Sequence, residues 1–67
     1  MIELTINGEA RSLPHAMALS AFLEAHGLHE KRVVVERNRE IVSRHTYAEV
    51  VLQAGDELEI VQMMAGG

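Results

Sequence analysis

The chemistry that this sequence can offer is concentrated in its last seven residues. The segment Val61-Gln62-Met63-Met64-Ala65-Gly66-Gly67 has no ionisable side chain, so its only reactive group is the carboxylate of Gly67. Ala65 and Gly66 add almost no steric bulk in front of that carboxylate. Because Gly makes up about 7% of average composition, two terminal glycines arise by chance in about one chain in two hundred. The segment is therefore unusual, and it suits a tail that enters a narrow channel and presents its carboxylate to another enzyme.

The histidines do not form a convincing metal site. His26 and His29 are close in sequence, but Gly27 interrupts the helix between them and no third ligand is indicated. His15 and His45 are expected in loops. The sequence therefore predicts no bound metal.

Candidate nucleophiles and carboxylate pairs also lack the required context. Ser12, Ser20 and Ser43 are not placed on a strand-turn-helix elbow that would activate a hydroxyl. Glu36 and Glu40 flank a predicted turn rather than a cleft. A chain of 67 residues has little room for a deep pocket with a supporting shell. We expect a binding module or carrier rather than an enzyme, with no cofactor bound.

Composition limits the class of protein further. Without cysteine there is no disulfide and no thiolate ligand, and a net charge of −4 argues against binding to nucleic acid. No apolar run approaches the length of a membrane span, and no export signal is seen, so a cytoplasmic protein, monomeric when free, is expected. Five of the six basic residues lie between positions 31 and 44, and they form either a solvated rim or a docking face for an acidic partner: Lys31, Arg32, Arg37, Arg39 and Arg44.

The first half of the chain predicts a hairpin followed by a helix. Apolar and polar residues alternate over residues 2–6, and Asn7-Gly8 is a strong signal for a tight turn. A return strand should cover residues 9–13, with Ala10 pointing inward. Helical spacing then appears over residues 18–26 without a good N-cap, followed by Gly27 in a left-handed C-terminal position with Leu28 folding back. The predicted apolar face of the helix consists of Leu19, Phe22, Leu23 and His26.

The second half predicts three more strands and a short helix. Residues 33–35 and 40–42 are expected to pair around a turn at Asn38-Arg39. Thr46-x-x-Glu49 matches a capping box, so a short helix or 3₁₀ segment should begin at Thr46. A turn at residues 54–56 then leads into the last strand. The order predicts an α+β roll with helices on one face of the sheet.

The last strand is expected to run from Glu57 to Met63. Leu58 and Ile60 should face the core, which places Val61 and Met63 on the opposite, solvent-facing side. Apolar residues there, directly before the tail, favour a surface for a partner. The alternative is that the strand ends near Val61, so that the alternation no longer applies.

At this point the residues resemble the thiamine-biosynthesis sulfur carriers of the ThiS family. The resemblance covers the whole chain, and its most specific motifs are Val35-Glu36-Arg37-Asn38-Arg39-Glu40-Ile41-Val42, Arg44, Tyr47-Ala48, Gly55-Asp56-Glu57-Leu58-Glu59-Ile60-Val61 and Ala65-Gly66-Gly67. The fold that this resemblance implies is the β-grasp, or ubiquitin-like, roll: a mixed sheet of about five strands with one main helix and a short second helix. The implied division is a β-grasp domain over residues 1–63 and a flexible tail over 64–67.

The resemblance also implies a role for the tail. An ATP-dependent adenylyltransferase similar to ThiF would adenylate the carboxylate of Gly67, and a persulfide sulfur would then convert it to a thiocarboxylate. Thiazole synthase, a ThiG-like partner, would receive that sulfur, with Gly66, Ala65, Met64, Met63 and Val61 contacting partners. ATP would belong to the activating partner rather than to this chain.

Two departures and two rivals accompany the resemblance. Ser43 stands where members often have proline, and Tyr47 stands where an aromatic residue, often Trp, is usual; both are expected to be structural positions. The small subunit of molybdopterin synthase shares the fold and the Gly-Gly end, but it typically has prolines where this chain has Gln62-Met63-Met64. A ubiquitin-like modifier joined to lysines is the third possibility.

Overall fold

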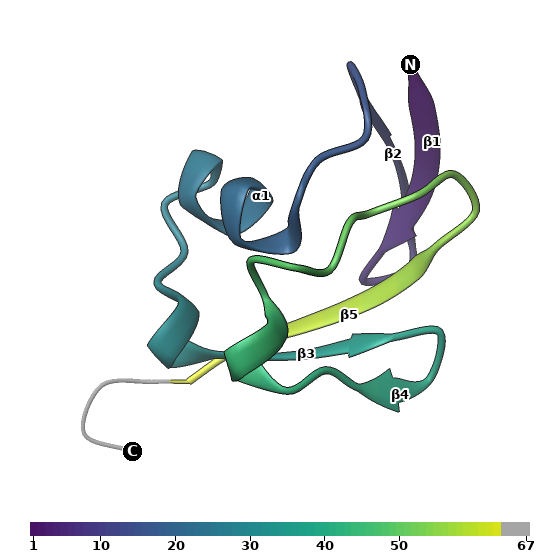
Figure 1. The fold of residues 1–67 in the computed structure, drawn as a ribbon. Coiled ribbons are helices and arrows are strands. Elements are labelled where there is room, and N and C mark those ends of the chain that lie inside the picture. The colour runs from purple at the N-terminus through teal and green to yellow at the C-terminus, as the bar shows by residue number, and fades with distance from the viewer. Residues whose placement is uncertain (64–67) are drawn as a thin grey trace.

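A computed structural model gives the fold, and it describes residues 1–63 (Figure 1). Along the chain the elements are β1 (Ile2–Ile6), β2 (Glu9–Leu13), α1 (Leu19–Ala25), the 3₁₀ helix η1 (Glu30–Arg32), β3 (Val33–Arg37), β4 (Glu40–Ile41), the 3₁₀ helix η2 (Arg44–Thr46) and β5 (Glu57–Gln62). The five strands form one sheet in the order β2-β1-β5-β3-β4. β1 and β5 are parallel, whereas the other neighbours are antiparallel. The predicted α+β class with a mixed five-stranded sheet is confirmed.

The first hairpin forms as predicted, with one side chain on the opposite face. Asn7 and Gly8 have φ values of 51° and 80°, as a two-residue turn with both central residues left-handed requires. This turn pairs Ile6 with Glu9 and Thr5 with Ala10. Ala10 therefore lies on the face opposite the buried Ile6, and the prediction that it points inward was wrong, because the turn length fixes the register.

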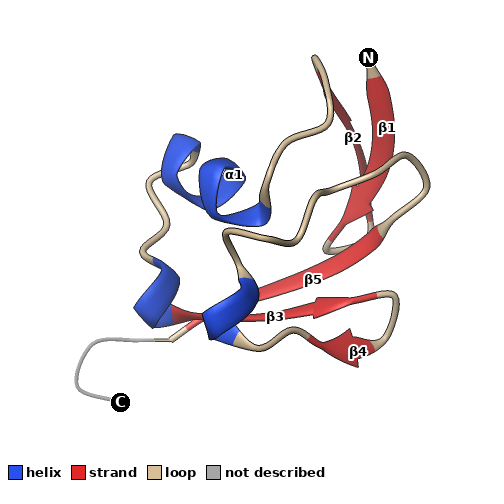
Figure 2. Ribbon diagram, viewed as in Figure 1, coloured by secondary structure: helices blue, strands red, loops and turns tan. Residues whose placement is uncertain are grey.

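Helix α1 lies across one face of the sheet (Figure 2). Leu19, Phe22 and Leu23 are buried, and Ala18 provides no side-chain cap, as predicted. The helix ends in a Schellman motif: Gly27 has φ 71°, and the N–H of Leu28 donates to the carbonyl of Leu23 at 2.9 Å.

His26 was expected on the apolar face of α1, and the structure corrects this. It is the exposed C-cap residue, and its ring lies 4.2 Å from the ring of Phe22, centroid to centroid. The helix ends at Ala25, directly before His26, and the Nδ1 atom of His26 lies 2.9 Å from the carbonyl oxygen of Phe22.

The second short helix is present, but it precedes Thr46 rather than following it. η2 ends at Thr46, whose hydroxyl donates to the carbonyl of Ser43 at 2.7 Å. The capping box was therefore wrong: the hydroxyl bonds backward, and the N–H of Glu49 closes a turn onto the carbonyl of Thr46 at 2.8 Å. η1 was not predicted; its first turn is capped by the ring of His29, which accepts from the N–H of Lys31 at 3.1 Å.

The core lies between the sheet, α1 and the segment of residues 42–56. Its buried members are Leu4, Ile6, Leu13, Leu19, Phe22, Leu23, Val33, Val35, Tyr47, Leu52 and Leu58. Figure 2 shows the helices and the long loop gathered on one side of the sheet, which leaves the opposite side, called here the outer face, uncovered. Among residues 1–63, no helix has both the length and the apolar composition that crossing a bilayer requires.

The burial of Tyr47 predicts a change of stability at alkaline pH. Desolvation raises the pKa of its phenol above the ordinary 10.0, with a hydrogen bond to the backbone of Val35 and the charge of Arg44 acting in the opposite direction. A raised folded-state pKa means that the stability is fully present below pH ~10 and is lost as pH rises through the folded pKa. Tyr47→Phe keeps the ring and should lack this loss, as urea unfolding at pH ~8 to ~11.5 would measure. Parallel losses in both proteins would contradict the assignment.

Candidate functional site: strand β5 and its exit

Most of the predicted reactive tail lies beyond the part of the chain that the structure describes. Gly67, Gly66, Ala65 and Met64 are outside the described residues, and so is the predicted tail of residues 64–67. The described chain ends at Met63, directly after β5 (Figure 1). The described residues show how the fold holds β5, the strand from which those residues continue.

β5 lies at the centre of the sheet and pairs along both edges. Five of its residues pair with β3, from Leu58 opposite Arg37 to Gln62 opposite Val33. On the other edge, β1 pairs in parallel through Thr5 opposite Glu57 and Ile6 opposite Leu58. Strands that are neighbours in the sequence pair as hairpins, whereas β5 joins the two hairpins to each other.

The start of β5 is fixed by the buried carboxylate of Asp56. This side chain is 6% exposed and accepts from Arg37 Nε at 2.9 Å, from the backbone N–H of Gln53 at 2.9 Å and from Asn38 Nδ2 at 3.3 Å. The backbone carbonyl of Asp56 also accepts a hydrogen bond from the N–H of Thr5 at 2.9 Å. A buried carboxylate is tolerated when it is ion-paired and its lone pairs are satisfied, and both conditions hold here.

Asn7 supports β5 beyond the point where β1 ends. Its side-chain oxygen accepts from the N–H of Ile60 at 2.8 Å, and its side-chain nitrogen donates to the carbonyl of Ile60 at 3.2 Å. The side-chain amide of Asn7 thus makes the two hydrogen bonds to β5 that one more backbone residue of β1 would make in the parallel ladder. Asn7 therefore has two roles: it adopts the positive φ that the turn requires, and it supports the strand that precedes the tail.

β3 and η1 hold the end of the strand. The N–H of Met63 donates to the carbonyl of Arg32 at 2.7 Å, next to the last paired residues, Val33 and Gln62. The backbone is therefore bonded up to the last described residue.

The outer face next to this exit is apolar and exposed. Val61 and Met63 are 60% and 48% exposed, so the predicted solvent-facing side chains are confirmed; their contact with a partner stays a prediction. Val34 lies directly opposite Val61 on β3 and is 41% exposed. Ile41 on β4 is 66% exposed. Val34 and Ile41 were missed, because the positions of Val34 opposite Val61 and of Ile41 opposite Glu36 depend on strand registers that the sequence does not specify.

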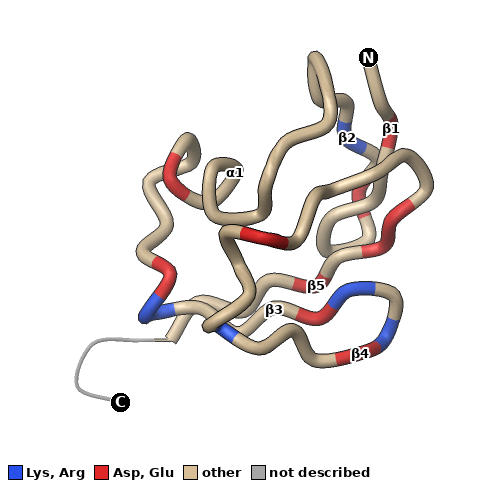
Figure 3. The backbone as a smooth tube through the Cα atoms, in the orientation of Figure 1, with Lys and Arg blue, Asp and Glu red and all other residues tan. Residues whose placement is uncertain are grey.

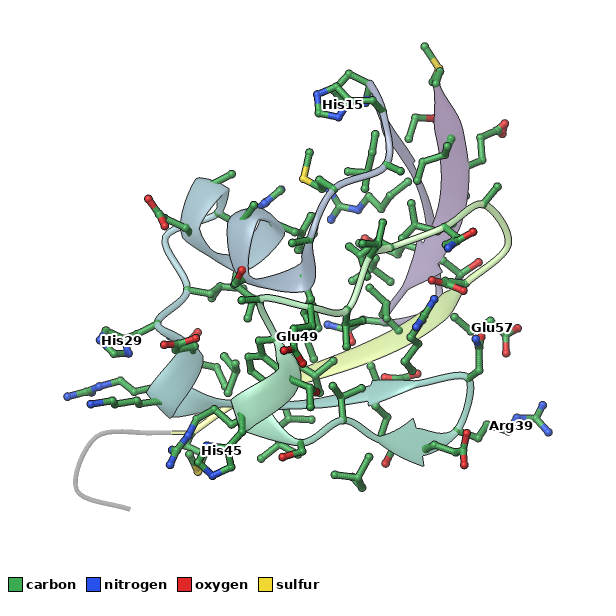
Figure 4. All side chains as sticks on the ribbon, viewed as in Figure 1. His15, His29, Arg39, His45, Glu49 and Glu57 are labelled. Atoms are coloured by element: carbon green, nitrogen blue, oxygen red, sulfur yellow. The ribbon has the colours of Figure 1, made fainter. Side chains whose placement is uncertain are left out.

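The structure divides the basic residues of the 31–44 segment. Arg37 is bound to Asp56, and Arg39 lies in the β3–β4 turn with φ 72°, well away from the chain exit (Figure 4). Lys31, Arg32 and Arg44 are exposed on the two 3₁₀ helices. The segment is therefore not one continuous docking face.

Within residues 1–63, His15 lies in a loop as predicted, whereas His45 lies in the 3₁₀ helix η2. This part of the chain holds no group of three His, Asp or Glu side chains with metal-site geometry. His15, His29 and His45 lie apart on the surface (Figure 4).

Known proteins resemble this chain along almost its whole length. The sequence profile described as the ThiS family matches residues 4–67. The chain belongs to the ThiS family. Of the two departures, Tyr47 is buried in the core as a structural residue, whereas Ser43 is the exposed N-cap residue of η2 and its side chain makes no capping hydrogen bond.

Three curated relatives show how the family domain is used. Thiazole synthases from Paramagnetospirillum magneticum and Magnetococcus marinus are 44% and 38% identical over 66 residues, which are 98% of this chain and 20% of each relative. The chain thus spans one fifth of the length of those two proteins. The sulfur carrier protein ThiS of Bacillus subtilis is 44% identical over 45 residues, covering 67% of this chain and 68% of that protein.

A solved structure supports the fold. The crystal structure of the thiamine biosynthesis protein ThiS from Geobacter metallireducens matches with a TM-score of 0.82 and 26% identity, over 98% of this chain and all of that one (100%). Its solution structure gives a TM-score of 0.80. The β-grasp fold that the resemblance implied is thereby confirmed.

The Asn7 amide gives a direct test of how β5 is held. Asn7→Gly keeps the positive φ but removes both bonds to Ile60, so the free energy of unfolding should fall by about 1–2 kcal/mol. Exchange of the Ile60 amide hydrogen should accelerate more than exchange at Leu58. Asn7→Asp is the matched control, because it keeps the acceptor for the Ile60 N–H. Unchanged protection of Ile60 in Asn7→Gly would contradict this role.

Proposed function

We propose that this protein is a sulfur carrier in thiamine biosynthesis, with the carboxyl group of Gly67 as the point of sulfur attachment. The observation that carries the proposal is the family match over residues 4–67, which includes the Gly66-Gly67 pair. The names of the relatives support it: one is a sulfur carrier protein ThiS, and two are thiazole synthases. The chain acts as a co-substrate, and the reactions are catalysed by its partners.

The chemistry requires activation before sulfur transfer, because a free carboxylate is a poor acyl donor. A carboxylate oxygen of Gly67 attacks the α-phosphorus of ATP on a ThiF-like adenylyltransferase and releases pyrophosphate. The terminal sulfur of a persulfide then attacks the acyl carbon and displaces AMP. Cleavage of the sulfur–sulfur bond by a thiol leaves the thiocarboxylate and a disulfide on the donor side. Thiazole synthase receives the sulfur from that thiocarboxylate.

The fold is suited to this use because β5 is fixed up to Met63. Five extended residues, from Met63 to Gly67, reach at most about 16 Å. That length lets the carboxyl group enter an enclosed site while the domain remains outside. A rigid origin for the tail lowers the number of orientations that must be sampled on each encounter.

The apolar outer face beside the exit serves as the contact surface for the partner. Val61, Met63 and Val34 form a patch at the base of the tail, and Ile41 lies on the same face of the sheet, on β4 opposite Glu36. Single exposed apolar residues are ordinary, but several on one uncovered sheet face indicate an interaction site. Burial of this patch seats the domain while the tail enters.

The terminal carboxylate is tested by mass. With a cognate adenylyltransferase, ATP and a persulfide donor, the intact protein should gain the mass of one oxygen-to-sulfur exchange, located at Gly67 by fragmentation. Deleting Gly67, or adding one residue after it, should abolish the gain and leave the unfolding curve unchanged, because Gly67 lies beyond the folded strands. A wild-type mass that never changes, or isopeptide-linked adducts on lysines instead, would reject the proposal.

The contact patch is tested by a conservative change. Val61→Thr keeps the β-branched shape, so the free energy of unfolding should change by less than about 0.5 kcal/mol. Loss of apolar burial in the complex, worth about 1 kcal/mol, should raise the KM for the carrier about fivefold in the thiazole synthase reaction. Val51→Thr is the matched control, since Val51 is 43% exposed but lies outside the sheet strands. Equal KM values for both variants would rule out the patch.

A further inference from the structure

The outer face of the sheet carries two like charges in direct opposition. Glu59 on β5 lies opposite Glu36 on β3, and both residues share the outer face with Val34 and Val61. Like charges across a strand pair lower the stability of a sheet. This arrangement does not stabilise the free domain, so folding does not explain why the two glutamates face each other.

The opposite charge gathers at the other end of β5. Arg32 lies next to Met63, because its carbonyl accepts the Met63 N–H at 2.7 Å. Lys31 precedes it in η1, next to the acidic Glu30, and Arg44 lies in η2. Within residues 1–63 these three cations form no ion pair, since the two that occur there join Arg11 to Glu9 and Arg37 to Asp56.

The result is a surface with a fixed order of charge along β5. Figure 3 shows acidic segments on β5, both acidic and basic segments on the β3–β4 hairpin, and basic segments where the chain enters β3 and in η2. Of the two cations on the hairpin, Arg37 is ion-paired with the buried Asp56, and Arg39 lies in the turn. Glu59 and Met63 are four residues apart, or about 13 Å along a strand. Between the acidic and the basic ends lies the apolar pair of Val34 and Val61.

We propose that this charge order aligns the domain on thiazole synthase, so that the tail points into the site that receives its sulfur. Acidic side chains at the mouth of that site face Lys31, Arg32 and Arg44, and a basic side chain about 13 Å away faces Glu36 and Glu59. The apolar patch between them is buried in the same contact. This inference rests on the proposed function and adds to it the chemistry of the partner's surface.

A protein surface fits these residues better than a polyanion does. A nucleic acid or an anionic membrane would meet the cations near Met63, but the same flat face would bring Glu36 and Glu59 against its phosphates. A surface with both signs satisfies both ends. Thiazole synthase is the committed partner because relatives of that name contain a domain like this one within a longer chain.

The basic end is tested by charge reversal at two matched positions. Arg32→Glu and Arg39→Glu change the net charge equally, and both side chains are exposed, but Arg39 lies in the β3–β4 turn, at the other end of β3 from Arg32. Binding of each variant to thiazole synthase would be measured by biolayer interferometry from ~50 to ~500 mM salt, where screening removes most of the effect. Arg32→Glu should weaken binding about tenfold at low salt, mostly through the association rate, whereas Arg39→Glu should change it less than about twofold.

The acidic end gives a test in which stability and affinity move in opposite directions. Glu59→Gln removes the repulsion from Glu36, so the Tm should rise by about 1–3 °C, while binding to thiazole synthase should weaken about threefold. Glu57→Gln is the control for the stability measurement, because Glu57 lies opposite the uncharged Thr5. A purely structural role for Glu59 would move the Tm without moving the affinity.

Several outcomes would overturn the inference, and they differ from failure of the proposed function. Equal effects of Arg32→Glu and Arg39→Glu, or a Glu59→Gln variant that binds as tightly as wild type, would reject the charge order alone. A salt-dependent loss seen only with the adenylyltransferase would reject thiazole synthase as the partner it serves. Wild-type protein that neither binds the synthase nor acquires sulfur would reject both proposals.

Discussion

The buried carboxylate of Asp56 is the interaction on which the placement of β5 depends. One side chain bonds Arg37 and Asn38 of the second hairpin and the loop residue Gln53, while the Asp56 backbone bonds Thr5 of the first hairpin. Three separate segments thus meet at the residue that precedes β5. Desolvating a carboxylate is unfavourable unless donors surround it, so the segments must arrive together. This requirement couples the two halves of the chain at the residue where the last strand begins.

Side-chain hydrogen bonds from the two hairpin turns also hold β5 in place. Asn7 bonds the backbone of Ile60 through its side chain, and the side-chain oxygen of Asn38 accepts from the N–H of Glu57 at 2.9 Å. Both residues have positive φ, near 50°. Asparagine tolerates that conformation and also has an amide with a donor and an acceptor, whereas glycine would meet only the first requirement. The turns of both hairpins therefore hold the strand that precedes the C-terminal residues.

Much of the fold could be predicted from local patterns, because those patterns act over a few residues. The alternation in residues 2–6, the Asn7-Gly8 turn and the helix end at Gly27 all formed as expected. The errors concern choices that depend on distant partners. Thr46 has a capping-box sequence, but its hydroxyl donates backward to the carbonyl of Ser43, and the next residue, Tyr47, is buried in the core. Val34 lies opposite Val61 because of the register between β3 and β5, which only the folded sheet defines.

Pairing of β5 on both edges also has a mechanical consequence. A partner that draws the chain beyond Met63 into a channel pulls along the axis of β5, parallel to the strands on either side. The bonds to β1 and β3 run across that axis, so such a pull loads them together in shear instead of breaking them one after another. A strand at the edge of a sheet, pulled sideways, would peel away at its last bond. The sheet order therefore lets the tail be held under tension while the domain to which it is attached keeps its shape.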